Sequence, residues 1–138
     1  MAVNTQFAIA VHIMAGIGFC PSGETTSAKI AESVNTSHSF VRRILAKLSK
    51  AGLVSTTMGK SGSSALARPP QDISLLEIYN AVDAPKVFAI HDYPEQASCP
   101  VSCGIKSSLD RVLDRTQSSV EKSLQHIKLS EVIADMRG

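Results

Sequence analysis

The feature that most constrains the fold is a helical pattern of apolar residues in the first half of the chain. Residues at i, i+1, i+4, i+5 and i+8 share one side of a helix, and this spacing is met by Phe40, Val41, Ile44, Leu45 and Leu48. The opposite side carries hydroxyls and cations without a carboxylate: Ser37, His38, Ser39, Arg42, Arg43, Lys47 and Lys50. A helix face of this composition suits phosphate groups and the edges of nucleic-acid bases.

A shorter helix is predicted directly before this one. Ser27 can cap it, and its buried stripe consists of Ile30, Ala31 and Val34. Asn35 and Thr36 end it, and Ser37 or Ser39 can cap the helix that follows. Two helices joined by so tight a turn form a helix-turn-helix, in which the second helix enters the major groove of DNA.

A β-hairpin is predicted after the second helix, which ends at Gly52. Residues 53–57 and 64–68 have strand character and flank the polar, glycine-bearing segment 58–63, with Lys60 and Ser61 near its tip. A hairpin in this position is a wing. The sequence therefore predicts a mainly α fold with a small β-hairpin wing, the winged helix-turn-helix, together with a long C-terminal helix.

The charge distribution supports a surface that binds a polyanion. Residues 33–71 contain six Lys or Arg and no Asp or Glu, whereas the whole chain has a net charge of only +2, so the remaining residues sum to −4. Positive charge concentrated in an otherwise acidic protein is typical of a surface that binds nucleic acid. We predict that a double-stranded DNA operator is contacted by Ser27, Ser37, His38, Ser39, Arg42, Arg43, Lys47, Lys60 and Ser61.

The N-terminal segment is predicted to form a supporting helix that Asn4 or Thr5 can cap and that Pro21 ends. Its expected buried stripe is Phe7, Val11, Met14 and Ala15. We expect His12 to be a structural histidine and Cys20 a small buried hydrophobe. No apolar run approaches the roughly 20 residues of a membrane span, and the segment lacks the basic leader of a secretory signal. We therefore expect a cytoplasmic protein without a membrane partner.

The chain is predicted to divide into three parts. Residues 1–83 form the winged domain, which a helix capped by Ser74 closes, and residues 84–100 form a proline-rich connector. Residues 101–138 form a long helix and a tail, and the apolar stripe of the helix includes Ile105, Leu109, Val112, Leu113, Val120 and Leu124. Because so small a protein offers little of its own to cover this stripe, we predict a homodimer; the alternative is that the stripe folds back on the winged domain.

Part of the sequence resembles a known protein family. The resemblance rests on the runs IAESVNTSHSFVRRILAKLSKAGLVST and GKSGSSALARPPQDISLLEIYNAVD, on the CPV that follows them, and on the long helix. They resemble the IscR/NsrR-type family of bacterial winged helix-turn-helix transcription regulators, including its cluster-free branch. The resemblance covers most of the chain and implies a dimer that binds a partly palindromic operator, with an iron–sulfur, nitrosative or oxidative signal in members whose input is known. Met58, Ser63 and Ala65 depart from the family's wing, and Arg42 stands where the iron–sulfur regulator has an acidic residue, so we expect a different operator.

The three cysteines, Cys20, Cys99 and Cys103, are the candidate sensor residues. Cys99 and Cys103 stand where the connector becomes the long helix, and a thiol there faces the positive end of the helix dipole and unpaired amides. Cluster-binding relatives carry three cysteines in this region, whereas this chain has two. We therefore expect no cofactor; an iron–sulfur cluster would require Cys20 from the partner subunit or a histidine such as His91 or His126.

The sequence thus predicts a dimeric DNA-binding transcription regulator, which we expect to be a repressor with a thiol-redox or unidentified input and no catalytic activity. The alternatives are an iron–sulfur-sensing regulator, a small thiol oxidoreductase that uses Cys99 and Cys103, and a winged module that binds protein. The oxidoreductase lacks a C-x-x-C motif. Neither it nor the protein-binding module explains the cations of residues 33–71.

Overall fold

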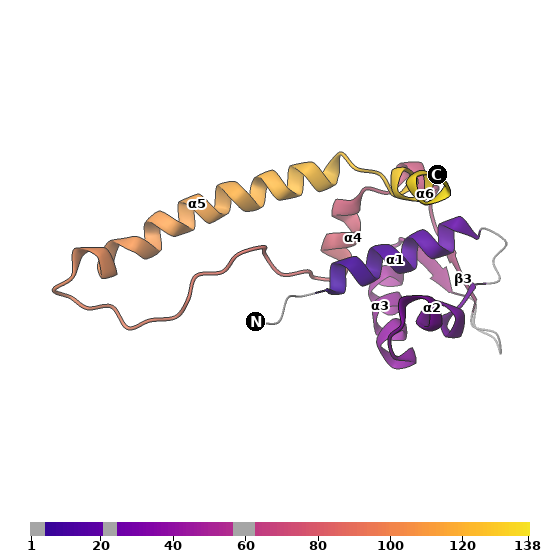
Figure 1. Cartoon of the computed structure of the whole chain (residues 1–138), viewed down its shortest axis with the longest axis horizontal. Helices are drawn as coiled ribbons and strands as arrows, with labels where there is room; N and C mark the ends of the chain where they lie inside the picture. Colours follow the sequence, from indigo (N-terminus) through magenta and orange to yellow (C-terminus); the bar gives the residue numbers. More distant parts are fainter. Residues whose placement is uncertain (1–4, 21–24, 57–62) are drawn as a thin grey trace. The chain divides into compact units, whose positions relative to one another are not determined.

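The computed structural model describes residues 5–20, 25–56 and 63–138, and the chain forms two compact units. The first unit contains residues 1–84 and 124–138, and the second contains residues 85–123. In chain order the elements are α1 Gln6–Phe19, β1 Thr25–Thr26, α2 Ser27–Val34, α3 His38–Lys50, β2 Val54–Thr56, β3 Ser63–Leu66, the 3-10 turn η1 Pro70–Asp72, α4 Leu75–Ala81, α5 Pro100–Gln125 and α6 Leu129–Arg137 (Figure 1).

The core of the first unit is built around α1, which contacts α2, α4, α6 and β3. Its buried residues are Ala10, Ile13, Met14, Ala15 and Ile17. The predicted stripe was therefore correct for Met14 and Ala15, whereas Phe7 and Val11 are only half-buried. The reason is that α1 is apolar on nearly every side and is covered from several directions, so no single stripe describes it.

The helix-turn-helix is formed by α2 and α3, which pack against each other. Asn35 ends α2 in the left-handed conformation, with φ of 61°, and Ser37 caps α3 by accepting the backbone N–H of Phe40 at 3.2 Å. The predicted cap of α2 was wrong. Thr26 accepts the N–H of Lys29 at 3.2 Å, and Ser27 is already the first helical residue. As predicted, Val41, Ile44, Leu45 and Leu48 are buried, and Phe40 packs at the edge of this core.

The described strands form one antiparallel sheet in the order β1-β3-β2. Val54 pairs with Leu66 on one side of β3, and Thr25 pairs with Ser64 on the other. The two hairpin strands were predicted, although both are shorter than expected; β1 was missed because a strand of two residues has no alternating pattern to read. The predicted contacts Lys60 and Ser61 lie outside the described residues.

The C-terminal helix α6 belongs to the first unit. Leu129 and Ile133 are buried, and backbone hydrogen bonds join Leu75 N–H to Ile127 O and Leu129 N–H to Ile73 O, each at 2.9 Å. The structure thus differs from the predicted division, which placed residues 124–138 with the long helix. Leu124, a predicted dimerisation residue, also packs against the first unit's core and is half-buried in the single chain. Two buried apolar positions and a paired backbone explain why this segment is not an open tail.

In the second unit the connector runs beside α5 in the opposite direction. Val87 N–H donates to the side-chain oxygen of Gln117 at 3.0 Å, and Tyr93 O–H donates to the carbonyl of Ser102 at 2.6 Å. Gln117 is a buried polar residue that the sequence pattern did not single out. On α5, Ile105, Leu109, Leu113 and Val120 are half-buried, whereas Val112 remains 51% exposed.

Candidate nucleic-acid interface

The candidate interface is the outer face of α3, which the buried stripe holds against the first unit's core. His38, Ser39, Arg42 and Arg43 are exposed on this helix, and Lys47 is half-buried. Adjacent residues project about 100° apart on a helix, so Arg42 and Arg43 point in different directions. These side chains lie on the part of α3 that its buried stripe leaves open to solvent.

The N-terminus of α3 is held by short polar contacts. Ser37 Oγ lies 3.5 Å from Ser39 Oγ, and Ser27 Oγ shares a hydrogen bond of 3.4 Å with His38 Nε2. The second contact joins the first residue of α2 to the first residue of α3. It brings the predicted DNA contacts Ser27 and His38 together beside the amides of the α3 N-terminus, a position that suits a phosphate.

The two arginines of α3 have different surroundings. The guanidinium carbon of Arg43 lies 5.4 Å from the centroid of the Phe40 ring, which is the geometry of a cation–π contact. Among the described residues no aromatic ring makes the same contact with Arg42. Arg43 is thus oriented by its own helix, whereas Arg42 projects from the exposed face without such a restraint.

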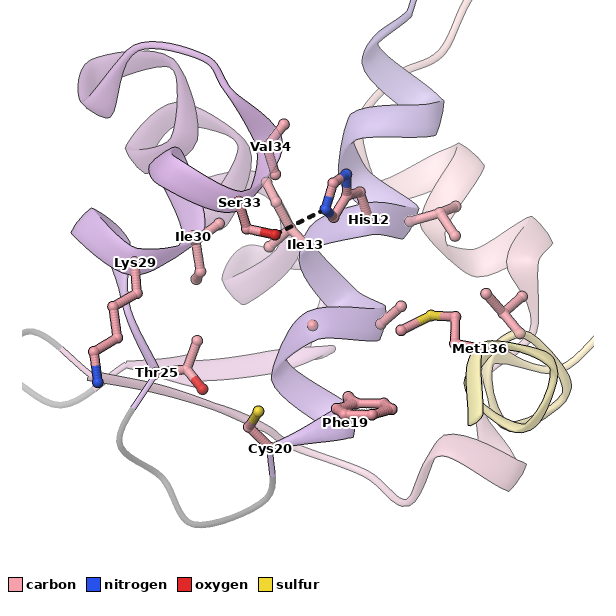
Figure 2. Close-up of a pocket in the computed structure, with 14 residues that line it drawn as sticks. His12, Ile13, Phe19, Cys20, Thr25, Lys29, Ile30, Ser33, Val34 and Met136 are labelled. Atoms are coloured by element: carbon pink, nitrogen blue, oxygen red, sulfur yellow. Dashed lines mark hydrogen bonds between the residues drawn. The ribbon is translucent and has the colours of Figure 1, made fainter. Parts of the chain in front are cut away.

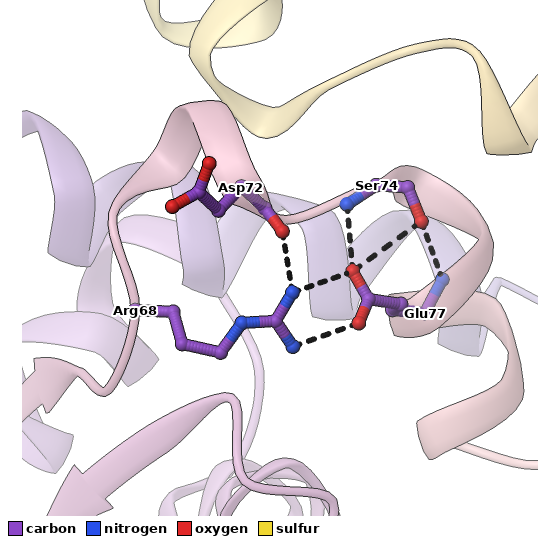
Figure 3. Close-up of polar contacts among 4 residues, drawn as sticks. All are labelled: Arg68, Asp72, Ser74 and Glu77. Atoms are coloured by element: carbon purple, nitrogen blue, oxygen red, sulfur yellow. Dashed lines mark hydrogen bonds and ion pairs between the residues drawn. The ribbon is translucent and has the colours of Figure 1, made fainter.

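One of the six cations of residues 33–71 has a structural role. Arg68, which follows β3, donates to Glu77 of α4 through two nitrogens, at 2.7 and 3.1 Å, and also donates to the carbonyl of Asp72 (Figure 3). The charge count therefore overstated the cations available to DNA. Glu77 was missed at the sequence level, although the pattern Ser-x-x-Glu at residues 74–77 is the signal of a capping box.

The same network shifts the pKa values of both partners. The hydrogen bond from Arg68 lowers the pKa of Glu77; partial burial opposes this, and the backbone N–H of Ser74 adds to the lowering. The hydrogen bond to Glu77 in turn raises the pKa of Arg68. Because Ser74 and Glu77 also form the capping box of α4, the network fixes the chain after β3 to the start of α4.

The cysteines are divided between the two units. Cys20 in the first unit is exposed, so the expectation of a buried thiol was wrong: Cys20 stands at the C-terminal end of α1, beyond Ile17, the last buried residue of that helix. In the second unit Cys99 is half-buried and its sulfur accepts the N–H of Ser102 at 3.4 Å, whereas the exposed Cys103 donates to the carbonyl of Gln96 at 3.4 Å. Both therefore contact the first turn of α5 or the chain that leads into it.

The described residues do not bring together a donor set for a metal centre. No group of three His, Cys, Asp or Glu side chains that could hold an ion occurs among them. Cys99 and Cys103 supply two thiols, fewer than the three or four donors that a cluster takes from a protein. The described residues of one chain therefore do not by themselves supply the donors that an iron–sulfur cluster needs. Within the described ranges, no helix has the length and apolar character needed to cross a bilayer.

A helix-turn-helix with a cationic second helix and a three-stranded wing sheet defines a winged-helix, DNA-binding regulator of transcription. A family model described as Rrf2, iron-dependent transcriptional regulator, matches residues 3–135. The chain belongs to the Rrf2 family of transcription regulators. This assignment confirms the resemblance to IscR/NsrR-type regulators and the predicted fold class.

Individual relatives agree with the assignment. The chain is 37% identical over 132 residues to YwnA of Bacillus subtilis (strain 168), and the match covers 95% of this chain and 96% of YwnA. The full name of that relative is "Putative HTH-type transcriptional regulator YwnA". It is 25% identical to the solved structure of T. potens IscR, with a TM-score of 0.69 and coverage of 99% and 88%. CymR, the global cysteine regulator of B. subtilis, shares the fold with a TM-score of 0.71, 19% identity and 97% coverage of both chains.

Proposed function

We propose that the protein is a homodimeric repressor that binds a partly palindromic operator through two copies of α3. The observation that carries this proposal is the exposed face of α3, where Ser39, Arg42 and Arg43 stand opposite a fully buried stripe. A repressor of this kind acts by occupying DNA and needs no catalytic group. It would work in the cytoplasm, where it has access to DNA.

Within this interface the residues take different roles. Arg42 is exposed beside Ser39 and can present its guanidinium to the two acceptors of a guanine in the major groove. Arg43 and Lys47 project about 100° or more away from Arg42 around the helix and suit phosphates, as do Ser37 and His38 at its N-terminus. Lys60 and Ser61 remain predicted contacts of the wing.

Dimerisation through α5 is supported by the apolar surface of the second unit. Val112 is 51% exposed and Val101 69% exposed in the single chain, at positions where a soluble helix would gain from cover. Ile105, Leu109, Leu113 and Val120 lie on the same stripe. A symmetric contact between two such helices would also set the spacing of the two recognition helices.

A thiol input is supported by the placement of Cys99 and Cys103 one helical turn apart at the start of α5. A peroxide would oxidise one thiol to a sulfenic acid, and the second thiol would displace water from it to form a disulfide. Because the disulfide would change the start of the proposed dimer helix, it would alter the alignment of the two winged domains without touching the DNA surface. A crystal structure of the oxidised form of CymR from Staphylococcus aureus has the same fold as this chain.

The test of DNA recognition begins with selection of bound sequences from random duplexes, using reduced and peroxide-treated protein in parallel. On the selected operator, Arg42→Ala should lose about 1–3 kcal/mol of binding free energy and relax specificity at one position. Arg111→Ala, on the exposed surface of α5, removes the same charge far along the chain and should leave the specificity unchanged. An equal loss on operator and random DNA for Arg42→Ala would contradict its role as the base-reading residue.

A further inference from the structure

A cavity of about 760 Å³ lies within the first unit, between α1, α2 and α6 (Figure 2). Its size falls in the range of small-molecule sites, about 300–1,000 Å³. Most of its surface is apolar and comes from side chains such as Phe19, Ile30, Val132 and Met136. No part of the proposed DNA contact uses this space.

The polar groups of the cavity are few and lie at its ends. In the view of Figure 2, Thr25, Lys29 and Cys20 lie toward one end, and the hydrogen bond of 3.0 Å between His12 and Ser33 lies toward the other. None of the described residues that line the cavity is Asp or Glu, and Lys29 is the lining residue with a fixed positive charge.

The position of Lys29 strengthens the positive potential at its end of the cavity. Lys29 lies in the first turn of α2, which has no acidic residue there, so its ammonium adds to the positive end of the helix dipole instead of offsetting it. Thr25 supplies a hydroxyl at the same end, so this end of the cavity favours a negatively charged group that can accept hydrogen bonds.

The two glycines of α1, Gly16 and Gly18, have different surroundings, and the difference shows where the helices leave space. A Cβ at Gly18 would lie 2.6 Å from Ile133 Cδ1, because α1 and α6 meet there. A Cβ at Gly16, which lines the cavity, would meet no atom within 4 Å, and its φ is not in the left-handed region. No close approach at Gly16 thus requires glycine, and the missing side chain leaves space between the helices.

We propose that this cavity binds a small amphipathic anion, with an apolar body among the side chains of α1 and α6 and a carboxylate or sulfonate at Lys29. Helix α2 packs on the recognition helix α3, and the His12–Ser33 hydrogen bond joins α2 to α1. An occupant between α1 and α2 therefore changes how α3 is positioned. This regulatory consequence rests on the proposed DNA-binding function. Binding of the anion itself does not.

The test uses the full chain and a fluorescent amphipathic sulfonate, 1-anilinonaphthalene-8-sulfonate, with decanoate and its neutral analogue decanol as competitors. Wild-type protein should bind the dye, and decanoate should displace it about tenfold more effectively than decanol because only decanoate pairs with Lys29. Lys29→Gln should remove that difference. Lys86→Gln, an exposed lysine of the second unit, should preserve it.

A second variant fills the cavity. Gly16→Leu should weaken dye binding at least about tenfold without lowering the thermal midpoint, since leucine is the better helix former and enters open space. Gly104→Leu makes the same change at a glycine of α5 with open surroundings and should leave dye binding unchanged. If Gly16→Leu impairs folding, the competition between decanoate and decanol on Lys29→Gln still tests the proposed anion site.

Three results would overturn the proposal: no dye binding by the wild type, unchanged dye binding by a folded Gly16→Leu protein, or an unchanged decanoate preference in Lys29→Gln. The second would mean that the dye occupies another apolar surface. These measurements contain no DNA, so their failure leaves the proposed DNA-binding function intact. Failure of the wild type to bind duplex DNA would refute that function and leave the anion site standing.

Discussion

Replacing Glu77 with glutamine tests how the wing is anchored to the rest of the winged domain. Arg68 follows β3, the central strand of the wing sheet, and Glu77 lies in the first turn of α4. The pair is bidentate, at 2.7 and 3.1 Å, and Arg68 also donates to the carbonyl of Asp72. We expect the substitution to loosen the segment between β3 and α4 without disturbing the buried core.

The magnitude follows from the exposure and geometry of the pair. Both side chains are 39% exposed, so solvent screens the attraction, and exposed ion pairs contribute only about 0.2–1 kcal/mol. The bidentate geometry favours the upper end of that range, about 1 kcal/mol. Glu77→Gln keeps an oxygen that can accept the N–H of Ser74, whereas Glu77→Ala also loses the capping box and should cost about 1 kcal/mol more.

The assay is denaturant unfolding of the full chain at one fixed protein concentration, for wild type, Arg68→Gln, Glu77→Gln and the double variant. The double-mutant cycle isolates the pairwise term, for which we expect a coupling free energy of about 1 kcal/mol. A coupling near zero would refute the view that the pair ties the wing to α4.

The pH dependence provides an independent check. Because Arg68 lowers the pKa of Glu77 in the folded protein, the unfolded chain takes up this proton at the higher pH. The stabilisation is therefore complete above the unfolded carboxyl pKa of about 4.3 and is lost as the pH falls through the folded value. The difference between wild type and Glu77→Gln should shrink in that acidic window. A difference that stays constant on acidification would contradict the assignment.

Three further outcomes are expected. Ser37→Ala removes the cap of α3 and should lower the free energy of unfolding by about 1 kcal/mol and weaken operator binding, measured by denaturation and by fluorescence anisotropy. Val112→Glu places a charge on the exposed stripe of α5 and should give monomers in sedimentation, because an unpaired charge at an interface costs several kcal/mol. The control Ser118→Glu, on another side of the helix, should remain dimeric. An intact Val112→Glu dimer would show that the stripe is not the interface. A variant with all three cysteines changed to serine should keep operator binding in peroxide, whereas wild type should lose it; release of both by peroxide would exclude a thiol input.

Local patterns were sufficient to predict the recognition helix α3 of the winged domain. The spacing of Val41, Ile44, Leu45 and Leu48 determines which side of α3 is buried, and Ser37 determines where the helix begins. These features depend on residues within one or two helical turns, so the order of the chain is enough to recognise them. The exposed arginines follow from the same periodicity.

Only the tertiary structure decided which surfaces meet across long distances in the chain. The burial of Leu129 and Ile133 depends on α1 and η1, which are more than 50 residues away, and the pairing of Arg68 with Glu77 required the fold of the segment between them. The exposure of Cys20 depends on where α1 ends, and the cavity beside Gly16 exists because three helices meet without filling the space. Periodicity identifies the apolar side of an element, but the partner that covers it is set by the packing of the whole chain.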